Sequence, residues 1–320
     1  GNTVSPQQVV KQFGADILRL WVAQSDYTVD LRIGDEILKG VTDSYRKLRN
    51  TARFLLGNLG TYSDKEDISY NQLPDLEKYI LHRVCEVDKK IRSFYREYSF
   101  QSVFQTYFQF CTQELSSFYF DIRKDVLYCD PETSLKRRAT LKVLDILFFR
   151  LTTWFSPILP FTMEEVYLER FPELENSVHL LDIPSNEKDW YNPKDAVVWD
   201  KIRNVRRVVT GAIEVLRQDK VIGSSLETCP VIHIKDKELF NIIKSVDMSE
   251  ICITSGINIE FSKNSIAHDC FMLDDVPDVG VICKTAQGKK CQRCWTLNIP
   301  SDKSEDELCF RCQQAVIEIT

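Results

Sequence analysis

The sequence lacks the patterns that mark membrane proteins and the common nucleotide and metal enzymes. No hydrophobic run approaches the roughly 18 to 20 residues that a membrane-spanning helix needs. There is no Walker-type phosphate loop, no G-x-G-x-x-G fingerprint and no H-E-x-x-H helix. The four histidines are isolated, and the adjacent Glu164 and Glu165 would point about 100° apart on a helix. We therefore expect no catalytic site in these 320 residues and no membrane partner.

A strong excess of positive charge is also missing. The formal net charge is -6, which excludes a uniformly basic nucleic-acid binder. Basic residues nevertheless gather locally, with five against one acidic residue in 39–53 and six against two in 201–220. Such faces are compatible with one shaped polyanionic partner, although any single Lys or Arg among them is better explained as a solvated surface residue.

Cysteine, in contrast, is abundant, with eleven residues. Seven are scattered among helical and strand patterns, which is unlike the disulfide framework of a small secreted protein. We find no signal peptide before them. We therefore expect a reducing, cytosolic compartment.

The other four cysteines form two C-x-x-C pairs, Cys291 with Cys294 and Cys309 with Cys312. The 14 residues between the pairs are enough for the chain to fold back and bring four thiolates to one point. Four thiolates form the closed tetrahedral environment of structural Zn²⁺, so we expect one structural zinc ion. The alternative is four free or disulfide-bonded cysteines, against which stand the flanking Gly288 and the matching positions of Arg293 and Arg311.

Apolar residues recur at helical spacing over most of the first 220 residues. Ser5 and Pro6 predict the start of a helix that ends at Gly14, and a second helix begins near Asp16. Further helices are expected over 34–62, 74–98, 99–128, 134–156, 162–170 and 196–219. Long amphipathic helices joined by short loops are typical of an antiparallel bundle.

The pattern changes after residue 220. Alternating apolar residues predict strands over 229–234, 251–254, 257–261 and 279–284, with a short helix over 239–246. The fold is therefore expected to be mainly α. It comprises a connector over 1–33, an antiparallel helical bundle over 34–220, a small α/β subdomain over 221–285 and a four-cysteine zinc ribbon over 286–320.

Several segments in order resemble the C-terminal part of bacterial-type class I isoleucyl-tRNA synthetases. They are GNTVSPQQVV, GADILRLWVAQSDY, RKLRNTARFLLGNL, SFYFDIRKDVLY, PILPFTMEEVY, KVIGSSLE, CQRCW and CFRC. The opening is similar to the sequence that follows the family's KMSKS loop, and the middle segments are similar to its helical anticodon-binding domain. The resemblance covers essentially the whole chain.

The resemblance implies that the sequence is part of a longer enzyme. The family's HIGH and KMSKS motifs and its editing domain are not found here. By resemblance, the whole enzyme activates isoleucine with ATP in a catalytic domain outside this sequence and charges tRNA(Ile). Residues 1–33 would follow that domain. This chain alone is expected to be inactive, to bind tRNA(Ile) and not DNA, and to belong to a monomer in the cytoplasm or an organellar matrix.

Anticodon bases are unpaired and can be stacked on aromatic rings or Arg planes, while Lys and Arg meet the phosphates. The RNA-binding candidates are Arg49, Arg53, Lys124, Arg203, Arg206, Arg207, Arg293 and Trp295. Arg49 with Asn50 could instead form a buried network that locks the bundle, and Trp295 could instead cover the core of the ribbon. The alternative functions are a zinc-stabilised helical module that binds protein, or the same region of a valyl or leucyl relative.

Overall fold

The computed structural model describes residues 4–60, 62, 68–172, 177–263, 266–299 and 307–318. The chain divides into two units, each held together by its own contacts. Unit 1 consists of Gly1–Arg123 and Leu135–Asn192, and unit 2 of Lys124–Ser134 and Pro193–Thr320.

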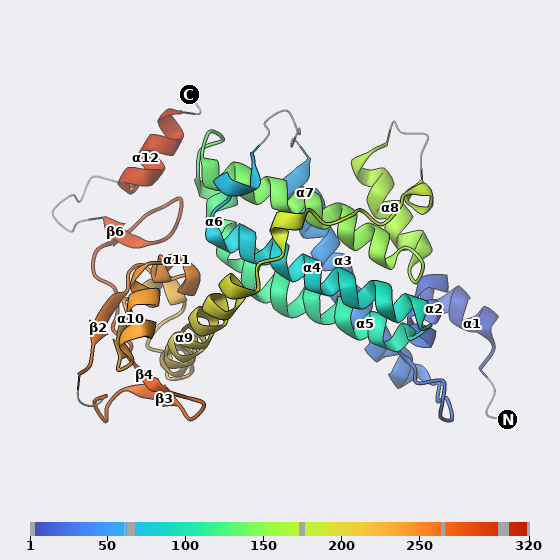
Figure 1. The fold of residues 1–320 in the computed structure, drawn as a ribbon, viewed down its shortest axis with the longest axis horizontal. Helices are drawn as coiled ribbons and strands as arrows, with labels where there is room; N and C mark the ends of the chain where they lie inside the picture. Colours follow the sequence, from blue (N-terminus) through green and yellow to red (C-terminus); the bar gives the residue numbers. More distant parts are fainter. Residues whose placement is uncertain are drawn as a thin grey trace. The chain divides into compact units, whose positions relative to one another are not determined.

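Unit 1 is a helical bundle, as the apolar periodicity predicts. Its long helices run side by side in Figure 1: α3 (Asp35–Leu59), α4 (Asp75–Arg96), α5 (Phe100–Gln109) and α7 (Leu135–Phe155). Shorter elements complete it, namely α1 (Pro6–Phe13), α2 (Ala15–Gln24), α8 (Pro160–Arg170) and the 3-10 turns η1 (Tyr70–Gln72), η3 (Val178–Leu180) and η4 (Lys188–Trp190). No helix within the described residues is long and apolar enough to cross a membrane.

Local signals set the ends of the first helices. Ser5 is extended at the N-cap of α1 and Pro6 follows at its first position, as predicted. Gly14 has φ of +93°, a conformation that L side chains rarely adopt, and it separates α1 from α2. On α2, Asp16 accepts hydrogen bonds from the backbone N–H of Thr162 at 2.7 Å and from its hydroxyl at 2.5 Å. The carboxylate thereby satisfies a free N–H group at the start of α8.

The helix predicted over 99–128 contains a wider central segment. Between α5 and α6 (Asp121–Cys129), the segment η2 (Phe110–Phe120) has π-helical hydrogen bonding. The hydroxyls of Ser116 and Ser117 donate to carbonyls five residues earlier, at 2.8 and 2.6 Å. Apolar spacing does not separate this pattern from an ordinary helix, so the sequence predicts one uniform helix.

Two arginines hold residues 183 and 184 of the acidic connection between α8 and α9 (Pro193–Gln218) against the bundle. Arg92 on α4 donates to the carbonyl oxygens of Ile183 and Pro184, at 3.1 and 2.8 Å. Arg150 on α7 also donates to the carbonyl of Pro184. Hydrogen bonds to side chains, rather than a repeating pattern, therefore position this segment.

Unit 2 joins α9 (Pro193–Gln218) to a four-stranded sheet of order β2-β1-β4-β3. The strands are β1 (Val231–Ile234), β2 (Asn258–Phe261), β3 (Phe271–Leu273) and β4 (Val276–Ile282). Strand β1 pairs parallel to β2 and antiparallel to β4, and β3 pairs antiparallel to β4. Around them lie η5 (Ser225–Glu227), α10 (Lys237–Lys244) and α11 (Met248–Cys252). The predicted small α/β arrangement is present.

The predicted strand over 251–254 is wrong. Asp247 caps a short helix there, because its carboxylate accepts from the backbone N–H groups of Ser249 and Glu250 at 3.0 and 3.1 Å. The helix α11 ends at Ile253, whose φ is +57°. The alternation of Ile251 with Ile253 therefore reflects a helix end rather than a strand. The short strand β3 was not predicted.

The C-terminal ribbon consists of two short strands and one helix. Strands β5 (Lys289–Lys290) and β6 (Leu297–Ile299) pair antiparallel, and α12 (Phe310–Ile317) follows. The first cysteine pair lies between the two strands, and the second lies at the start of α12.

Candidate metal centre and nucleic-acid contact residues

The structure brings the four paired cysteines to one point. The Sγ atoms of Cys291, Cys294, Cys309 and Cys312 all lie within 4.8 Å of one another, and all four residues are buried. The Sγ atoms of Cys294 and Cys309 are 3.7 Å apart. Zn–S bonds of about 2.3 Å in a tetrahedron put neighbouring sulfurs about 3.8 Å apart, so the donor set and its size fit a metal ion.

The surroundings of the thiols favour a bound cation. Burial by itself would raise the pKa of Cys291, but the backbone N–H groups of Cys294, Cys309 and Arg293 lower it to about 6. Burial, with the nearby Cys294, raises the pKa of Cys309 and Cys312. One thiol is thus prepared to ionise, while the ionisation of all four together needs a positive ion between them.

Each cysteine pair sends its arginine to the end of α6. Arg293 donates to the carbonyl oxygens of Tyr128, at 3.2 Å, and Cys129. Arg311 forms a double hydrogen bond with Asp125, at 2.5 and 2.8 Å. Arg293 thereby satisfies carbonyls that a helix end leaves free, and the two arginines fasten the ribbon to residues 125–130.

Trp295 stands exposed directly after the first cysteine pair. Its side chain is 60% exposed, and Lys290 Nζ lies 5.6 Å from the centre of its ring. Its φ is +66°, unusual for a bulky residue, while its N–H donates to the carbonyl of Cys291 at 3.0 Å. The prediction that Trp295 covers the ribbon core fits this exposure poorly. A base could stack on the exposed ring.

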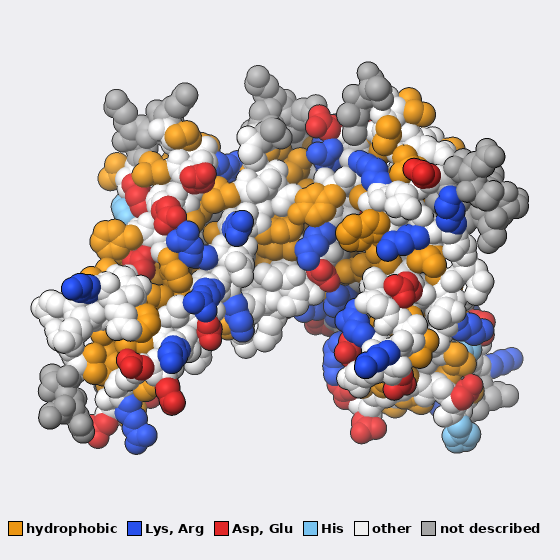
Figure 2. Space-filling view, turned by 180° about the vertical axis from the view of Figure 1, so that it is seen from behind, with side chains coloured by type: hydrophobic (Ala, Val, Ile, Leu, Met, Phe, Trp, Pro, Cys, Tyr) orange, Lys and Arg blue, Asp and Glu red, His pale blue; other side chains and the backbone are white. Residues whose placement is uncertain are grey.

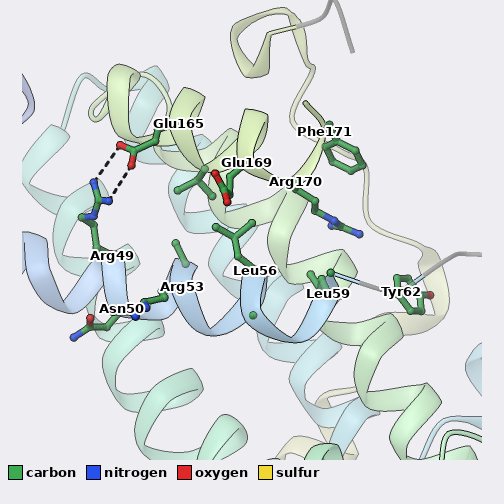
Figure 3. A pocket seen from close by; sticks show the side chains of 14 residues that line it. Arg49, Asn50, Arg53, Leu56, Leu59, Tyr62, Glu165, Glu169, Arg170 and Phe171 are labelled. Atoms are coloured by element: carbon green, nitrogen blue, oxygen red, sulfur yellow. Dashed lines mark hydrogen bonds and ion pairs between the residues drawn. The ribbon is translucent and has the colours of Figure 1, made fainter. Parts of the chain in front are cut away.

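Arg49 and Arg53 line one pocket of about 720 Å³ between α3 and α8. Figure 3 shows Arg49 facing Glu165, with Asn50 and Arg53 beside it on α3. Arg49 makes two hydrogen bonds to Glu165, at 2.9 and 3.2 Å, and these raise its pKa above its usual value. Glu169 lies on the wall that α8 supplies.

Arg49 therefore pairs with Glu165, whereas the alternative drawn from the sequence was a buried network with Asn50. Its Nη1 also donates to Tyr45 at 3.1 Å, and Tyr45 and Thr162 share a hydrogen bond of 2.9 Å. This exposed network joins α3 to α8. Arg53 and Asn50 make no side-chain hydrogen bond or ion pair to the residues that the structure describes, and both are exposed.

Two of the α9 arginines predicted to contact RNA, Arg206 and Arg207, are engaged within unit 2. Arg206 donates to the carbonyl of Ile251 at 2.9 Å, and Arg207 pairs with Asp275 at 2.9 Å. Arg203 is half-buried and has partners as well. Lys124, also with partners, is exposed on α6. On the face drawn in Figure 2, Lys and Arg are interspersed with Asp and Glu, so positive charge there occurs in small groups and not as one continuous surface.

Comparisons with known proteins agree with this architecture. A family model described as the anticodon-binding domain of tRNA ligase matches residues 77–233. A second, described as tRNA synthetases class I (I, L, M and V), matches residues 1–34. The chain contains the anticodon-binding domain of class I tRNA ligases. The match to this domain includes the α8 wall of the pocket, while Arg49 and Arg53 lie between the two matched ranges.

Beyond the anticodon-binding domain, the similarity extends over the whole chain. The chain is 50% identical over 99% of its length to isoleucine–tRNA ligase of Ruegeria pomeroyi, covering 32% of that protein. It is 47% identical over its full length to the isoleucine–tRNA ligases of Bartonella henselae and Agrobacterium fabrum, covering 33% of each. The chain thus spans about a third of the length of these relatives.

A solved structure was also found. One chain of the ternary complex of Agrobacterium radiobacter K84 agnB2 LeuRS with tRNA and LeuAMS aligns with 60% of this chain and 22% of its own. The TM-score is 0.47 at 15% identity, which is too low to add to the argument.

Sequence reasoning missed the acidic partners in both sites. In the sequence Glu165 stands out only as one of an adjacent carboxylate pair, whereas its pairing with Arg49 joins positions 116 residues apart. Asp125 was likewise not connected with Arg311, 186 residues away. An arginine inside each C-x-x-C pair was the only visible signal of the second contact.

Proposed function

We propose that this chain is the tRNA-binding and anticodon-recognising part of an isoleucine–tRNA ligase. The whole protein would act in the cytoplasm as a monomer, activating isoleucine with ATP outside this chain and charging tRNA(Ile). Identity of 46–50% over essentially the full chain to proteins named isoleucine–tRNA ligase supports this specificity. The observation that carries the RNA-binding role is the pocket between α3 and α8, whose α8 wall belongs to the matched anticodon-binding domain.

The pocket has the chemistry that an unpaired base requires. Its volume of about 720 Å³ is ample for a nucleotide. Leu56, Gly57 and Val166 give it an apolar wall for the face of a base. Arg53 can donate and Asn50 can both donate and accept hydrogen bonds at a base edge.

The remaining predicted RNA contacts lie outside this pocket, and we include them in the same proposal. Trp295 is proposed to stack on a base, because it is 60% exposed and held by a left-handed backbone. Arg203, Arg206 and Arg207 are proposed only as phosphate contacts at the surface of α9, since all three already have partners and the last two fasten other elements of unit 2. Arg293 and Lys124 are proposed as contacts of the same kind.

The four buried cysteines are proposed to hold one structural Zn²⁺. The sulfur spacing and the all-thiolate donor set support zinc, and four ligands leave no open position for catalysis. The ion would fold the ribbon and supply no chemistry to aminoacyl transfer.

Two substitutions on α3 test the pocket. Arg53→Ala should weaken binding of tRNA(Ile) and lower the salt slope by about one, because one phosphate or base contact is lost. Gly57→Leu should weaken binding by about tenfold, because a Cβ at Gly57 meets no atom within 4 Å and a larger side chain would enter the pocket. Fluorescence anisotropy with labelled tRNA(Ile) measures both effects.

Matched controls lie on the same helix. Gly40→Leu also projects into open space but away from the pocket, and Arg46→Ala removes an exposed arginine that pairs with Asp43. Both should leave the Kd within about twofold of the parent protein. Unchanged binding by Arg53→Ala and Gly57→Leu, with helical content intact, would remove this pocket from the RNA interface.

A further inference from the structure

A second hollow lies in unit 2, where the α/β subdomain passes into the ribbon. Its volume is about 330 Å³. Three stretches of chain converge on it: the residues before β1, the start of β2 with the loop before it, and the loop after β4; β6 closes one side. The lining includes Cys229, Ser255, Asn258, Lys284, Gln287 and Leu297.

The frame of this hollow is fixed by backbone hydrogen bonds. Cys229 N–H donates to the carbonyl of Lys284 at 2.7 Å, and Ala286 N–H to that of Glu227 at 2.8 Å. The N–H of Leu297 donates to the hydroxyl of Ser255 at 2.7 Å. These three hydrogen bonds hold the walls of the hollow in place without a ligand.

Three polar side chains of the lining, in contrast, have no strong partners: Lys284, Gln287 and Asn258. Lys284 and Gln287 are exposed and make no side-chain hydrogen bond or ion pair within the described part of the chain. The amide of Asn258 reaches only the Sγ of Cys229, at 3.9 Å, a weak contact. None of the lining residues is acidic. The hollow thus offers two amides and one ammonium group, which suit a polar or anionic ligand rather than a cation.

We propose that this hollow binds one unpaired nucleotide of the bound tRNA, separate from the pocket between α3 and α8. The inference rests on the proposed function, since that supplies the RNA. Asn258 and Gln287 would read donor and acceptor groups on the base edge, and Lys284 would meet a phosphate. The volume is at the lower end for ligand sites, which suits a single nucleotide and not a folded segment.

The hollow also connects the metal site with RNA binding. Leu297 belongs to β6, which pairs with β5 directly before Cys291. One wall is therefore supplied by the ribbon, whose folding depends on the metal ion. Loss of the metal should open this wall while leaving the pocket in unit 1 intact.

Cys229 allows a direct test, because its half-buried thiol lines the hollow. The full chain is treated with iodoacetamide with and without tRNA(Ile), and alkylation of each cysteine is followed by peptide mass spectrometry. Cys270, half-buried beside β4 outside the hollow, is an internal reference. With tRNA at about ten times its Kd, alkylation of Cys229 should slow about fivefold to tenfold, and that of Cys270 should not change.

The outcomes separate this inference from the proposed function. If anisotropy shows saturating tRNA binding while Cys229 alkylates at its free rate, this site is wrong and the proposed function stands. If no tRNA binds at all, both fall. Lys284→Ala and Gln287→Ala give an independent measure: each should weaken tRNA binding about threefold to tenfold, and Lys235→Ala, an exposed lysine outside the hollow, should not. Equal Kd values for all three variants would also overturn the assignment.

Discussion

Replacing Cys309 with Ser is expected to abolish metal binding at the four-cysteine site and unfold the ribbon. Cys309 is one of the four candidate ligands and occupies the N-cap position of α12, and its N–H donates to the Sγ of Cys291 at 3.3 Å. In small zinc-binding modules the free energy of metal binding is the free energy of folding, on the order of 10 kcal/mol. Metal content should fall from one per chain to near zero, and amides of α12 should lose protection from hydrogen exchange.

The loss should reach residues 125–130 but not the bundle. Arg293 and Arg311 hold the end of α6 only while the ribbon is folded, so hydrogen exchange there should rise as well. The amides of α4 and α7 should keep their protection, because they belong to unit 1.

Cys129 provides the matched control for this experiment. It is buried in the same cluster as the four paired cysteines, but its Sγ contacts the backbone oxygen of Arg293, at 3.8 Å, and it does not belong to the candidate ligand group. Cys129→Ser should therefore keep one metal ion per chain. Full metal content in Cys309→Ser, or its loss in Cys129→Ser, would contradict the ligand assignment.

The second large effect is expected in the core of unit 1. Glu77 on α4 is completely buried, and Arg123 on α6 is 3% exposed. Arg123 makes two hydrogen bonds of 2.6 Å to the Glu77 carboxylate, which also accepts from Tyr119 at 3.2 Å and Thr140 at 3.1 Å. Arg123→Met would leave a buried carboxylate without its charge partner. We expect a loss of about 3 to 5 kcal/mol in the free energy of unfolding, measured by urea denaturation.

Two further variants separate the charge effect from a general loss of packing. Arg46→Met removes an exposed arginine whose partner is Asp43, and its effect should stay within about 0.5 kcal/mol. The double variant Glu77→Leu with Arg123→Met removes both buried charges and should regain much of the lost stability. A loss below about 1 kcal/mol in Arg123→Met would show that the pair is not buried as described.

Most of unit 1 follows from periodicity, because long amphipathic helices carry their apolar spacing over many turns. Ser5, Pro6 and Gly14 even mark the ends of α1. The short elements of unit 2 carry less information. Ile251 and Ile253 alternate as in a strand, but Asp247 caps a helix at this position. The π-helical hydrogen bonds of η2 change which backbone groups pair without changing the apolar spacing enough to be seen.

The candidate sites, too, could be predicted from the sequence only in part. The four cysteines could be predicted because metal ligands need fixed spacings within each pair. The partner of Arg49 could not, since Glu165 is 116 residues away and only the packing of α8 on α3 brings the two together. The contacts of Arg206 and Arg207 could not be predicted either. The excess of basic residues over 201–220 suggested that both side chains were available to RNA, but each has a partner within unit 2.

Binding of tRNA(Ile) by this chain, compared with a tRNA(Ile) of altered anticodon at two salt concentrations, tests the central claim most directly. Fluorescence anisotropy should show that the cognate anticodon binds about tenfold or more tightly, since hydrogen bonds to base edges are lost on substitution. Both affinities should fall as salt rises, because phosphates are contacted in each case. Equal affinity for the two tRNAs at both salt concentrations would contradict anticodon recognition by this chain.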